Sequence, residues 1–322
     1  MKCNITPRLV LALLASQAWF SAPAASEITF GITSTTALSL PHFIAEEKKY
    51  YEAEALAVDT IAAGSAARVL QQLAAGSLNI AQAATDQTLR AIMRGAPIRI
   101  IAGAASNAPF RMVAAQGTKR WGELKGKSLS VGGLTDVTLY FLRVMARKNG
   151  LADQDYDLLY GGGTPSRFAQ LASGAVAAAI LTNPQDFAAL EQGFVDLGSV
   201  PQYLPNWAQN NILIDTRWAP RHRAEILAFL RVHTRATRYF YDPANRDEVI
   251  AILAKYTKTT PDIAASTYDL YVRLRVIAPD GALFPEGLKA NLDAFVAMGE
   301  LTEPPPLAGF IDASFLGEAA RP

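Results

Sequence analysis

Short polar segments stand directly after several predicted strands, where helices begin. Their hydroxyl, carboxylate and amide groups, together with the free N–H groups of a first helical turn, can hold a small polar or anionic molecule. Ligands of α/β proteins commonly bind at the carboxyl ends of strands. The alternative for each residue is helix capping, because Ser, Thr, Asp and Asn are preferred N-caps. The candidate ligand contacts of this kind are Ser34, Thr35, Thr36, Thr85, Asp86, Thr135, Asp136, Thr138 and Asn183.

Other polar residues are singled out by their position in the chain. Ser106 and Asn107 interrupt the pattern where the chain is expected to cross between two lobes, so they are either hinge residues or ligand contacts. His42 opens a helix beside the predicted ligand site and is a further candidate contact. Arg68 and Arg167 occupy matching places in two related segments, and an ion pair or a solvated position is favoured over ligand binding for both.

No catalytic or metal-binding motif stands out in the sequence. His222 and His233 are eleven residues apart, which is not a metal-ligand spacing. The three glycines at 161–163 precede a helix without the lysine of a phosphate-binding loop, and no nucleophile elbow or dinucleotide fingerprint follows a strand. The single cysteine, Cys3, lies in the N-terminal leader, so no disulfide or thiol chemistry is expected. We therefore predict no catalytic residues, no cofactor and no bound metal.

Two stretches of the chain have nearly the same pattern of residues. Residues 64–81 and 163–180 each contain a glycine, an arginine four positions later, an apolar helix that ends in glycine, and a short run of small apolar residues. A glycine after a helix is a C-cap, because it reaches a positive φ without a Cβ clash. Each stretch is therefore the helix–strand half of a βαβ unit, and the pair predicts two α/β lobes with a ligand site between them.

The order of predicted elements divides the chain. From Glu27 to Gly103 the order β-α-β-α-β predicts a mostly parallel sheet covered by helices. Arg111 to Ala115 starts the second lobe, and the strand from Asn210 to Asp215 is expected to pair with it as the chain crosses back. From Pro220 onward the pattern is helical. The predicted domains are a cleaved leader at 1–25, a first lobe at 26–110 and 218–322, and a second lobe at 111–217.

The N-terminus has the three regions of a secretory signal peptide. Lys2 and Arg8 precede an apolar run from Leu9 to Phe20, and small residues through Ala25 form a cleavage site. The apolar run is too short to span a bilayer, and no cysteine follows it, so we expect a secreted protein that is not a lipoprotein. The alternative is an N-terminal anchor or a disordered leader. Cleavage leaves one more acidic than basic residue, which indicates no nucleic-acid partner.

Several short segments, taken in order, carry a family resemblance. They are residues 41–51, 70–84, 95–97, 101–103, 124–129 and 170–184. In their order and spacing the chain resembles the solute-binding proteins of ABC importers, in the branch that includes nitrate, sulfonate and taurine binders and thiamine-precursor binders. Asn79 and Ala177 stand where this family commonly has an acidic residue. The resemblance implies the two-lobe periplasmic binding protein type 2 architecture: each lobe a mixed, mostly parallel sheet with flanking helices, and two crossing strands.

The resemblance also implies a function and partners. The expected protein is a periplasmic, monomeric component that captures a small solute between its lobes by hinge closure. The solute would be a sulfonate-, nitrate- or taurine-like anion, or a pyrimidine or aromatic compound. The partners would be a membrane permease and its ATPase. One alternative is an enzyme on the same fold, similar to pyrimidine-precursor synthases, although those relatives carry a cysteine-rich motif. The other is a ligand sensor for a membrane kinase.

Overall fold

The chain folds into two lobes, each built on one β-sheet. The computed structural model describes Met1 and residues 26–321, so the leader predicted at 1–25 lies outside the described residues except for Met1. The sheet of the first lobe has the strand order β2-β1-β3-β10-β4. β1 is parallel to β2 and β3, whereas β10 is antiparallel to β3 and β4. Its strands are β1 (Ser26–Ile32), β2 (Leu56–Ala62), β3 (Ile80–Ala84), β4 (Ile98–Ala105) and β10 (Asn210–Asp215).

Helices from two parts of the chain flank the first sheet or pack on the helices that do. β3 and β10 are buried along their whole length, as expected for central strands with both faces covered. The helices are α1 (Leu40–Glu47), α2 (Tyr50–Ala53), α3 (Ala66–Ala75), α4 (Thr85–Met93), α8 (Arg223–Tyr241), α9 (Arg246–Thr257), α10 (Pro261–Arg273), α11 (Pro285–Ala297) and α12 (Ser314–Ala319). The helical pattern predicted from Pro220 onward is confirmed as α8 to α12.

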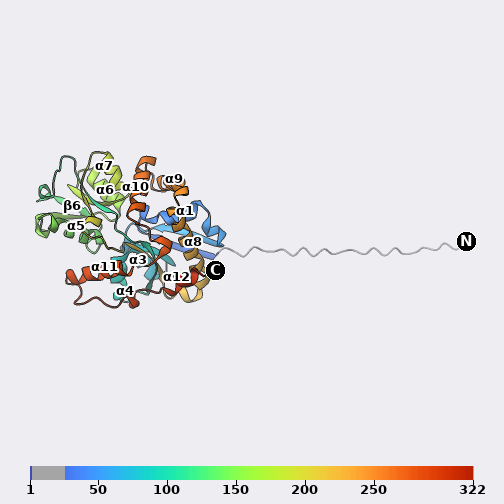
Figure 1. The fold of residues 1–322 in the computed structure, drawn as a ribbon. Helices are drawn as coiled ribbons and strands as arrows, with labels where there is room; N and C mark the ends of the chain where they lie inside the picture. The colour runs from blue at the N-terminus through green and yellow to red at the C-terminus, as the bar shows by residue number, and fades with distance from the viewer. Residues whose placement is uncertain (2–25, 322) are drawn as a thin grey trace.

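The second lobe repeats the plan of the first. Its sheet has the order β7-β6-β8-β5-β9, with β6 parallel to β7 and β8, and β5 antiparallel to β8 and β9. The strands are β5 (Phe110–Ala114), β6 (Ser128–Val131), β7 (Asp157–Tyr160), β8 (Ala178–Thr182) and β9 (Val195–Ser199), and the helices are α5 (Val137–Lys148), α6 (Thr164–Ala172) and α7 (Gln185–Glu191). Figure 1 shows α5, α6 and α7 together on one side, in green, and α1, α8 and α12 on the other.

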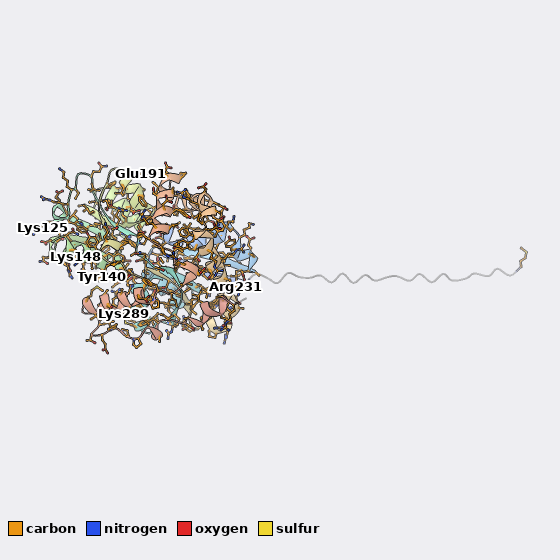
Figure 2. The ribbon with its side chains drawn as sticks, viewed as in Figure 1. Lys125, Tyr140, Lys148, Glu191, Arg231 and Lys289 are labelled. Carbon is orange, nitrogen blue, oxygen red and sulfur yellow. The ribbon has the colours of Figure 1, made fainter. Side chains whose placement is uncertain are left out.

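Single turns of 3₁₀ helix connect these elements. They are η1 (Ala37–Ser39), η2 (Trp121–Leu124), η3 (Asp153–Asp155), η4 (Val200–Gln202), η5 (Ala219–Arg221), η6 (Pro243–Asn245), η7 (Pro279–Gly281) and η8 (Leu307–Gly309). Figure 2 shows the side chains on the same view, with Lys125, Tyr140 and Lys148 on the second lobe and Arg231 on the first.

The two matching stretches of sequence take equivalent places in the two lobes. The first forms α3 and β3, and the second forms α6 and β8. Gly76 ends α3 at φ 80° and Gly174 follows α6 at φ 75°, so both glycines hold the left-handed conformation predicted for them. β3 and β8 are each the third strand of their sheet, next to the antiparallel strand. The predicted internal repeat is confirmed, and so is the two-lobe α/β fold class.

The expected pairing of the strand at Asn210–Asp215 with Arg111–Ala115 is wrong. β10 lies between β3 and β4 in the first sheet, while β5 pairs with β8 and β9 in the second. Residues 210–215 therefore share a sheet with the first lobe rather than with the predicted second lobe at 111–217. Strand pairing depends on long-range packing, so two strands that both stand at crossings could not be assigned to their sheets from local pattern.

The crossing segment is anchored by aromatic packing. Trp207 precedes β10 and is 2% exposed. Its ring stacks on Tyr140 at 5.4 Å between centroids and lies edge-on to Phe141 at 5.3 Å, both on α5. Pairs of this kind stabilise by about 0.5–1.5 kcal/mol beyond area burial. Trp207 therefore belongs to the core rather than to the wall of the cleft. No helix within residues 26–321 is long and apolar enough to cross a membrane.

Candidate ligand-binding cleft

A cleft lined mainly by residues with polar side chains lies between the two lobes. The space inside it that is open to the centre of a water molecule is about 60 Å³. The first lobe contributes Thr33, Ser34, Thr36, Leu38, Ser39, Ser65, Ala66, Gln82 and Ala84. The second lobe contributes Asp136, Val137, Thr138, Gly162, Gly163, Thr164, Arg167 and Thr182, and the crossings contribute Phe110, Gln209 and Asn210. The cleft is therefore lined by strand ends and helix N-termini of both lobes.

Arg167 is the one basic side chain among these lining residues. It projects from α6 and is 3% exposed. Nε donates to the carbonyl oxygen of Ile180 (2.7 Å), one terminal nitrogen donates to the carbonyl of Gly162, and the other donates to Thr164 Oγ1 (2.8 Å). Burial lowers the pKa of Arg167 to about 10, against the opposing effect of the Asp136 charge, so the guanidinium stays protonated at neutral pH.

The glycines before α6 make room for Arg167. A Cβ on Gly161 would lie 2.7 Å from Arg167 Cγ and 2.7 Å from Gln170 Oε1. Gly162 and Gly163 face the other lobe, where added Cβ atoms would lie 3.5 and 3.4 Å from the carbonyl oxygen of Gly64. The three glycines thus allow Arg167 and the opposite lobe to come close to the backbone. This close approach, rather than phosphate binding, accounts for the run of three glycines.

Asp136 is the acidic side chain of the cleft lining. It caps α5, because Oδ1 accepts from the backbone N–H of Thr138 (3.0 Å) and from its hydroxyl (2.5 Å). The hydroxyl oxygen of Thr138 in turn accepts from the N–H of Gly132 (2.7 Å). Oδ2 accepts from Gln87 Nε2 of the first lobe (3.1 Å). The carboxylate therefore fixes a helix N-terminus, touches the opposite lobe and borders the cleft at once.

Neutral amides from the first sheet complete the lining. Gln82, in the middle of β3, donates from Nε2 to the carbonyl of Leu38 (2.8 Å), which fixes its side chain. Gln209 and Asn210 come from the start of β10 and are buried. Gln209 Oε1 is a buried acceptor that has no hydrogen-bond partner in the described part of the chain. An acceptor of this kind is costly unless a ligand or water donates to it.

The two lobes touch on both sides of the cleft. Besides the Gln87–Asp136 hydrogen bond, Arg90 donates to the carbonyl of Thr135 (3.4 Å), and the N–H of Ala37 donates to the carbonyl of Asn183 (3.3 Å). These contacts join α4 and the segment before α1 in the first lobe to the residues that precede α5 and α7 in the second. The structure is therefore a closed arrangement, in which a ligand would be largely surrounded.

Four residues predicted as ligand contacts line this cleft. They are Ser34, Thr36, Asp136 and Thr138. Thr35 is half-buried beside them but is not part of the lining, and Thr135 is exposed on a neighbouring surface groove with Gln87 and Arg90. The structure therefore places residues of the loop after β1 and of the start of α5, both predicted to contact ligand, in the lining of this cleft.

Three other predicted contacts lie away from the cleft lining. His42 is buried in the first lobe, with its ring nitrogens 2.9 Å from Tyr51 Oη and 2.9 Å from Thr60 Oγ1. Ser106 and Asn107 follow β4 at the crossing, where the N–H of Ser106 donates to the carbonyl of Val276 and Asn107 Nδ2 donates to that of Leu274. Both therefore tie the crossing to the C-terminal part of the chain.

Thr85, Asp86 and Asn183 are buried just behind the cleft. Thr85 Oγ1 accepts from Asn211 (2.7 Å), and Asp86 pairs with Arg90 (2.8 Å). Burial raises the pKa of Asp86 to about 7. Asn183 Nδ2 donates to both carboxylate oxygens of Asp186 (2.8 and 2.9 Å). Each side chain thus has a partner inside its own lobe, while Asp86 Oδ1 and Asn183 Oδ1 are buried without a hydrogen-bond partner among the described residues.

The sequence missed the amides and Arg167 as cleft residues. Gln82, Gln209 and Asn210 stand within or beside apolar strands and gave no separate signal. Arg167 was expected to be structural because Arg68 matches it, but the two differ in the fold: Arg68 is exposed and Arg167 lines the cleft. The glycine run before Arg167 was the available signal. Within the described residues, no group of three or more His, Cys, Asp or Glu side chains could hold a metal ion.

Solved structures share this fold. The ligand-binding component of an ABC-type import system from Staphylococcus aureus, with zinc bound, is 12% identical, with a TM-score of 0.78 over 92% of this chain and 100% of that one. The alkanesulfonate-binding protein SsuA from Xanthomonas axonopodis pv. citri, bound to MOPS, is 18% identical, with a TM-score of 0.71 over 91% and 99%. The periplasmic nitrate-binding protein NrtA from Synechocystis PCC 6803 is 16% identical, with a TM-score of 0.71 over 93% and 89%.

These likenesses establish the fold, which is that of periplasmic binding proteins. Among curated proteins, none matches the sequence at a significant level. The model of the family described as NMT1/THI5 like matches residues 37–246, which contain all of the second lobe and every strand of the first sheet except β1. Because this match extends over most of the chain, the protein belongs to the NMT1/THI5-like family.

Proposed function

We propose that the chain is the periplasmic solute-binding component of an ABC importer. The observation that carries the proposal is the polar cleft, bordered by strand ends and helix N-termini of both lobes and closed by contacts between them. Clefts of this kind between domains are the usual sites for small molecules. The family and the shared fold support the same function.

Capture follows from the arrangement of the lobes. A solute that contacts both walls favours the closed arrangement over an open one by the difference in its affinity for the two. Closure about the crossings before β5 and before β10 then buries the solute. It also fixes the position of the two lobes relative to each other. A membrane permease with its ATPase would recognise the two lobes in this closed arrangement. The protein acts as a monomer. The predicted leader at 1–25 would direct the protein to the periplasm.

An enzyme on this fold is the alternative function. The cleft lining consists of hydroxyls, amides, apolar groups, Asp136 and Arg167, and it includes neither histidine, lysine nor cysteine. Nucleophilic catalysis by a serine or threonine needs a base within hydrogen-bond reach. The single carboxylate available, Asp136, is already engaged as a helix cap. The composition of the cleft therefore favours binding over catalysis.

The test is a ligand screen with the exported protein. Thermal melts with sulfonates, nitrate, amino acids, aromatic acids and pyrimidines should show one class that raises the melting temperature, and the ligand should be recovered unchanged. Deletion of the gene should abolish uptake of that compound by intact cells. Conversion of the ligand by the purified protein, or unchanged uptake after deletion, would refute the proposal.

A further inference from the structure

Asp86 is buried beside the contacts that join the two lobes. It lies in the first turn of α4 and is 2% exposed. The next residue on α4, Gln87, donates to Asp136 of the second lobe (3.1 Å), and Arg90, one turn further along, donates to the carbonyl of Thr135 (3.4 Å). The residues on either side of Asp86 in the helix sequence therefore hold the start of α5 against α4.

The positive charge nearest to Asp86 is shared with a second carboxylate. Arg90 donates to Asp86 Oδ2 through one terminal nitrogen (2.8 Å), whereas its Nε and its other terminal nitrogen both donate to Glu300 (2.8 and 3.0 Å). These bonds lower the pKa of Glu300, so Glu300 keeps its charge at neutral pH. Asp86 Oδ1 is buried without a hydrogen-bond partner among the described residues. Arg90 thus gives two hydrogen bonds to Glu300 and one to Asp86.

The second lobe adds a third carboxylate to this group. Burial raises the pKa of Asp86 to about 7, the charge of Arg90 opposes the rise, and the charge of Asp136 adds to it. Asp136 has a cation on its own side in Arg167, but the hydrogen bonds of Arg167 go to uncharged oxygens of the second lobe. A buried carboxyl group beside a like charge holds its proton more readily than the same group in water.

The other charged residues on the elements packed against α4 are exposed or half-buried. They are Arg68 on α3, Arg94 at the end of α4, Arg99 on β4, and Glu286, Lys289 and Asp293 on α11. Lys289 and Asp293 pair with each other (2.7 Å), and Arg99 donates to the carbonyl of Ile98 (3.0 Å). The charges that face Asp86 are therefore those of Arg90, Glu300 and Asp136.

We propose that closure of the lobes takes up one proton, on Asp86, so that mild acid favours the closed arrangement. This inference rests on the hinge closure of the proposed function and adds a regulation to it. When the lobes separate, Asp136 moves away and water reaches the cluster, so the ionised form of Asp86 is favoured. Because proton binding and closure are linked, the proton stabilises the closed arrangement in acid, and this stabilisation is lost as pH rises through about 7.

A disulfide between the lobes measures closure without any solute. A Cβ on Gly163 would lie 3.4 Å from the Cβ of Ser34 in the opposite lobe, close to the range of about 3.5–4.5 Å found in disulfides. Gly163 has a φ of −69°, which any residue adopts. The variant Ser34→Cys/Gly163→Cys, in a chain with Cys3→Ser, would be equilibrated with reduced and oxidised glutathione between about pH 5.5 and 7.5, below the usual thiol pKa of about 8.5. The equilibrium constant for the disulfide is proportional to the closed fraction, even where that fraction is small.

We expect this constant to fall about tenfold or more from pH 5.5 to 7.5, since one proton changes it by at most about tenfold per pH unit. Asp86→Asn keeps the shape of the side chain and cannot titrate, so it should abolish the fall. Asp136→Asn keeps a good N-cap for α5 and removes the facing charge, so it should make the fall smaller. Asp215→Asn is the matched control, because Asp215 is a buried carboxylate paired with Arg217 (2.7 Å) inside the first lobe, and it should retain the fall.

The outcomes separate proton uptake from solute binding. A constant that changes by less than about twofold over this range, or an equal fall in the parent and in Asp86→Asn, would overturn the proton uptake and leave the solute-binding function standing. If Asp86→Asn fails to fold, Asp136→Asn decides, and an unchanged fall in that variant overturns the inference. If the disulfide forms at no pH, the lobes do not reach the closed arrangement, and hinge closure fails together with the inference.

Discussion

Gln87 on α4 donates a hydrogen bond to Asp136 at the start of α5, across the boundary between the lobes, with 3.1 Å between Nε2 and Oδ2. Because this bond joins the two lobes, we expect it to break when they open. Gln87→Ala should therefore weaken ligand affinity by about tenfold, although Gln87 does not line the cleft. A tenfold loss lies within the range of about 1–3 kcal/mol for removing a hydrogen-bond partner of a charged group. Calorimetric titration, with small-angle scattering of the unliganded protein, would measure the loss and the shift toward open lobes. Gln71→Ala, an exposed glutamine on α3, is the control, and equal affinities of the two variants would contradict the prediction.

Arg167 and Arg68 form a natural pair for a second test, because they are equivalent in sequence and different in environment. Arg167→Gln should reduce the affinity for an anionic or zwitterionic ligand about a hundredfold, since it removes charge-assisted hydrogen bonds of about 1.5–3 kcal/mol each. Arg68→Gln should leave affinity unchanged, because that side chain is exposed on α3. Titration of both variants is the measurement. Full affinity in Arg167→Gln would show that the anionic group lies elsewhere.

Gly161 should control ligand affinity through Arg167. A methyl group at this position would meet Arg167 Cγ and Gln170 Oε1, both at 2.7 Å, so the arginine would have to move. Gly161→Ala should therefore reproduce much of the affinity loss of Arg167→Gln. Gly122→Ala adds a methyl group where nothing lies within 4 Å, and it should bind as the wild type does. Titration of the two variants would decide, and normal binding by Gly161→Ala would show that Arg167 needs no such space.

Asn183 and Thr85 should affect folding more than binding. Asn183→Ala removes two hydrogen bonds to the buried Asp186 carboxylate, and Thr85→Ala removes the acceptor for Asn211. We expect each to lower the free energy of unfolding by about 1–3 kcal/mol, the cost of leaving a buried partner unpaired. Neither side chain lines the cleft, so affinity should change little. Denaturant unfolding and titration on the same samples distinguish the two effects, and a large loss of affinity with unchanged stability would restore both residues to the ligand site.

The contribution of Asp186 to stability should fall as pH rises through the acid range. Burial raises the pKa of Asp186 from the usual 3.8 to about 6, despite the opposing effect of Arg111. The folded protein therefore holds a proton on this group at pH values where the unfolded chain has lost it. Its contribution to stability is fully present below about pH 4 and is lost as pH rises through about 6. Urea unfolding at a series of pH values should show this loss in the wild type and a smaller slope in Asp186→Asn; identical slopes would contradict it.

The local residue pattern was sufficient to predict the helices and strands, but not which strands pair with one another. The helices after Pro220 and the repeated helix–strand unit follow from periodicity and from glycine C-caps, which are local. The position of β10 in the first sheet does not follow from local pattern, because its run of apolar residues is compatible with either sheet. Similarly, hydroxyl residues at helix starts indicated part of the cleft, whereas Arg167 lines it because Gly161 leaves space for its side chain, which reaches the carbonyl oxygen of Ile180 on β8. That contact depends on the tertiary structure, so the spacing of residues in the sequence does not reveal it.

The place of β10 between β3 and β4 sets an order of assembly. The second sheet is complete once residues 110–199 are available, whereas the first sheet remains split until residue 215 arrives, more than a hundred residues after β4 ends. Pairings between distant segments are slow to form, because a long loop must close first. We therefore expect the first lobe to complete its folding after the second. A chain that is threaded through a membrane before it folds gains time from such a delay, since its N-terminal half cannot lock into a finished sheet while the rest is still emerging.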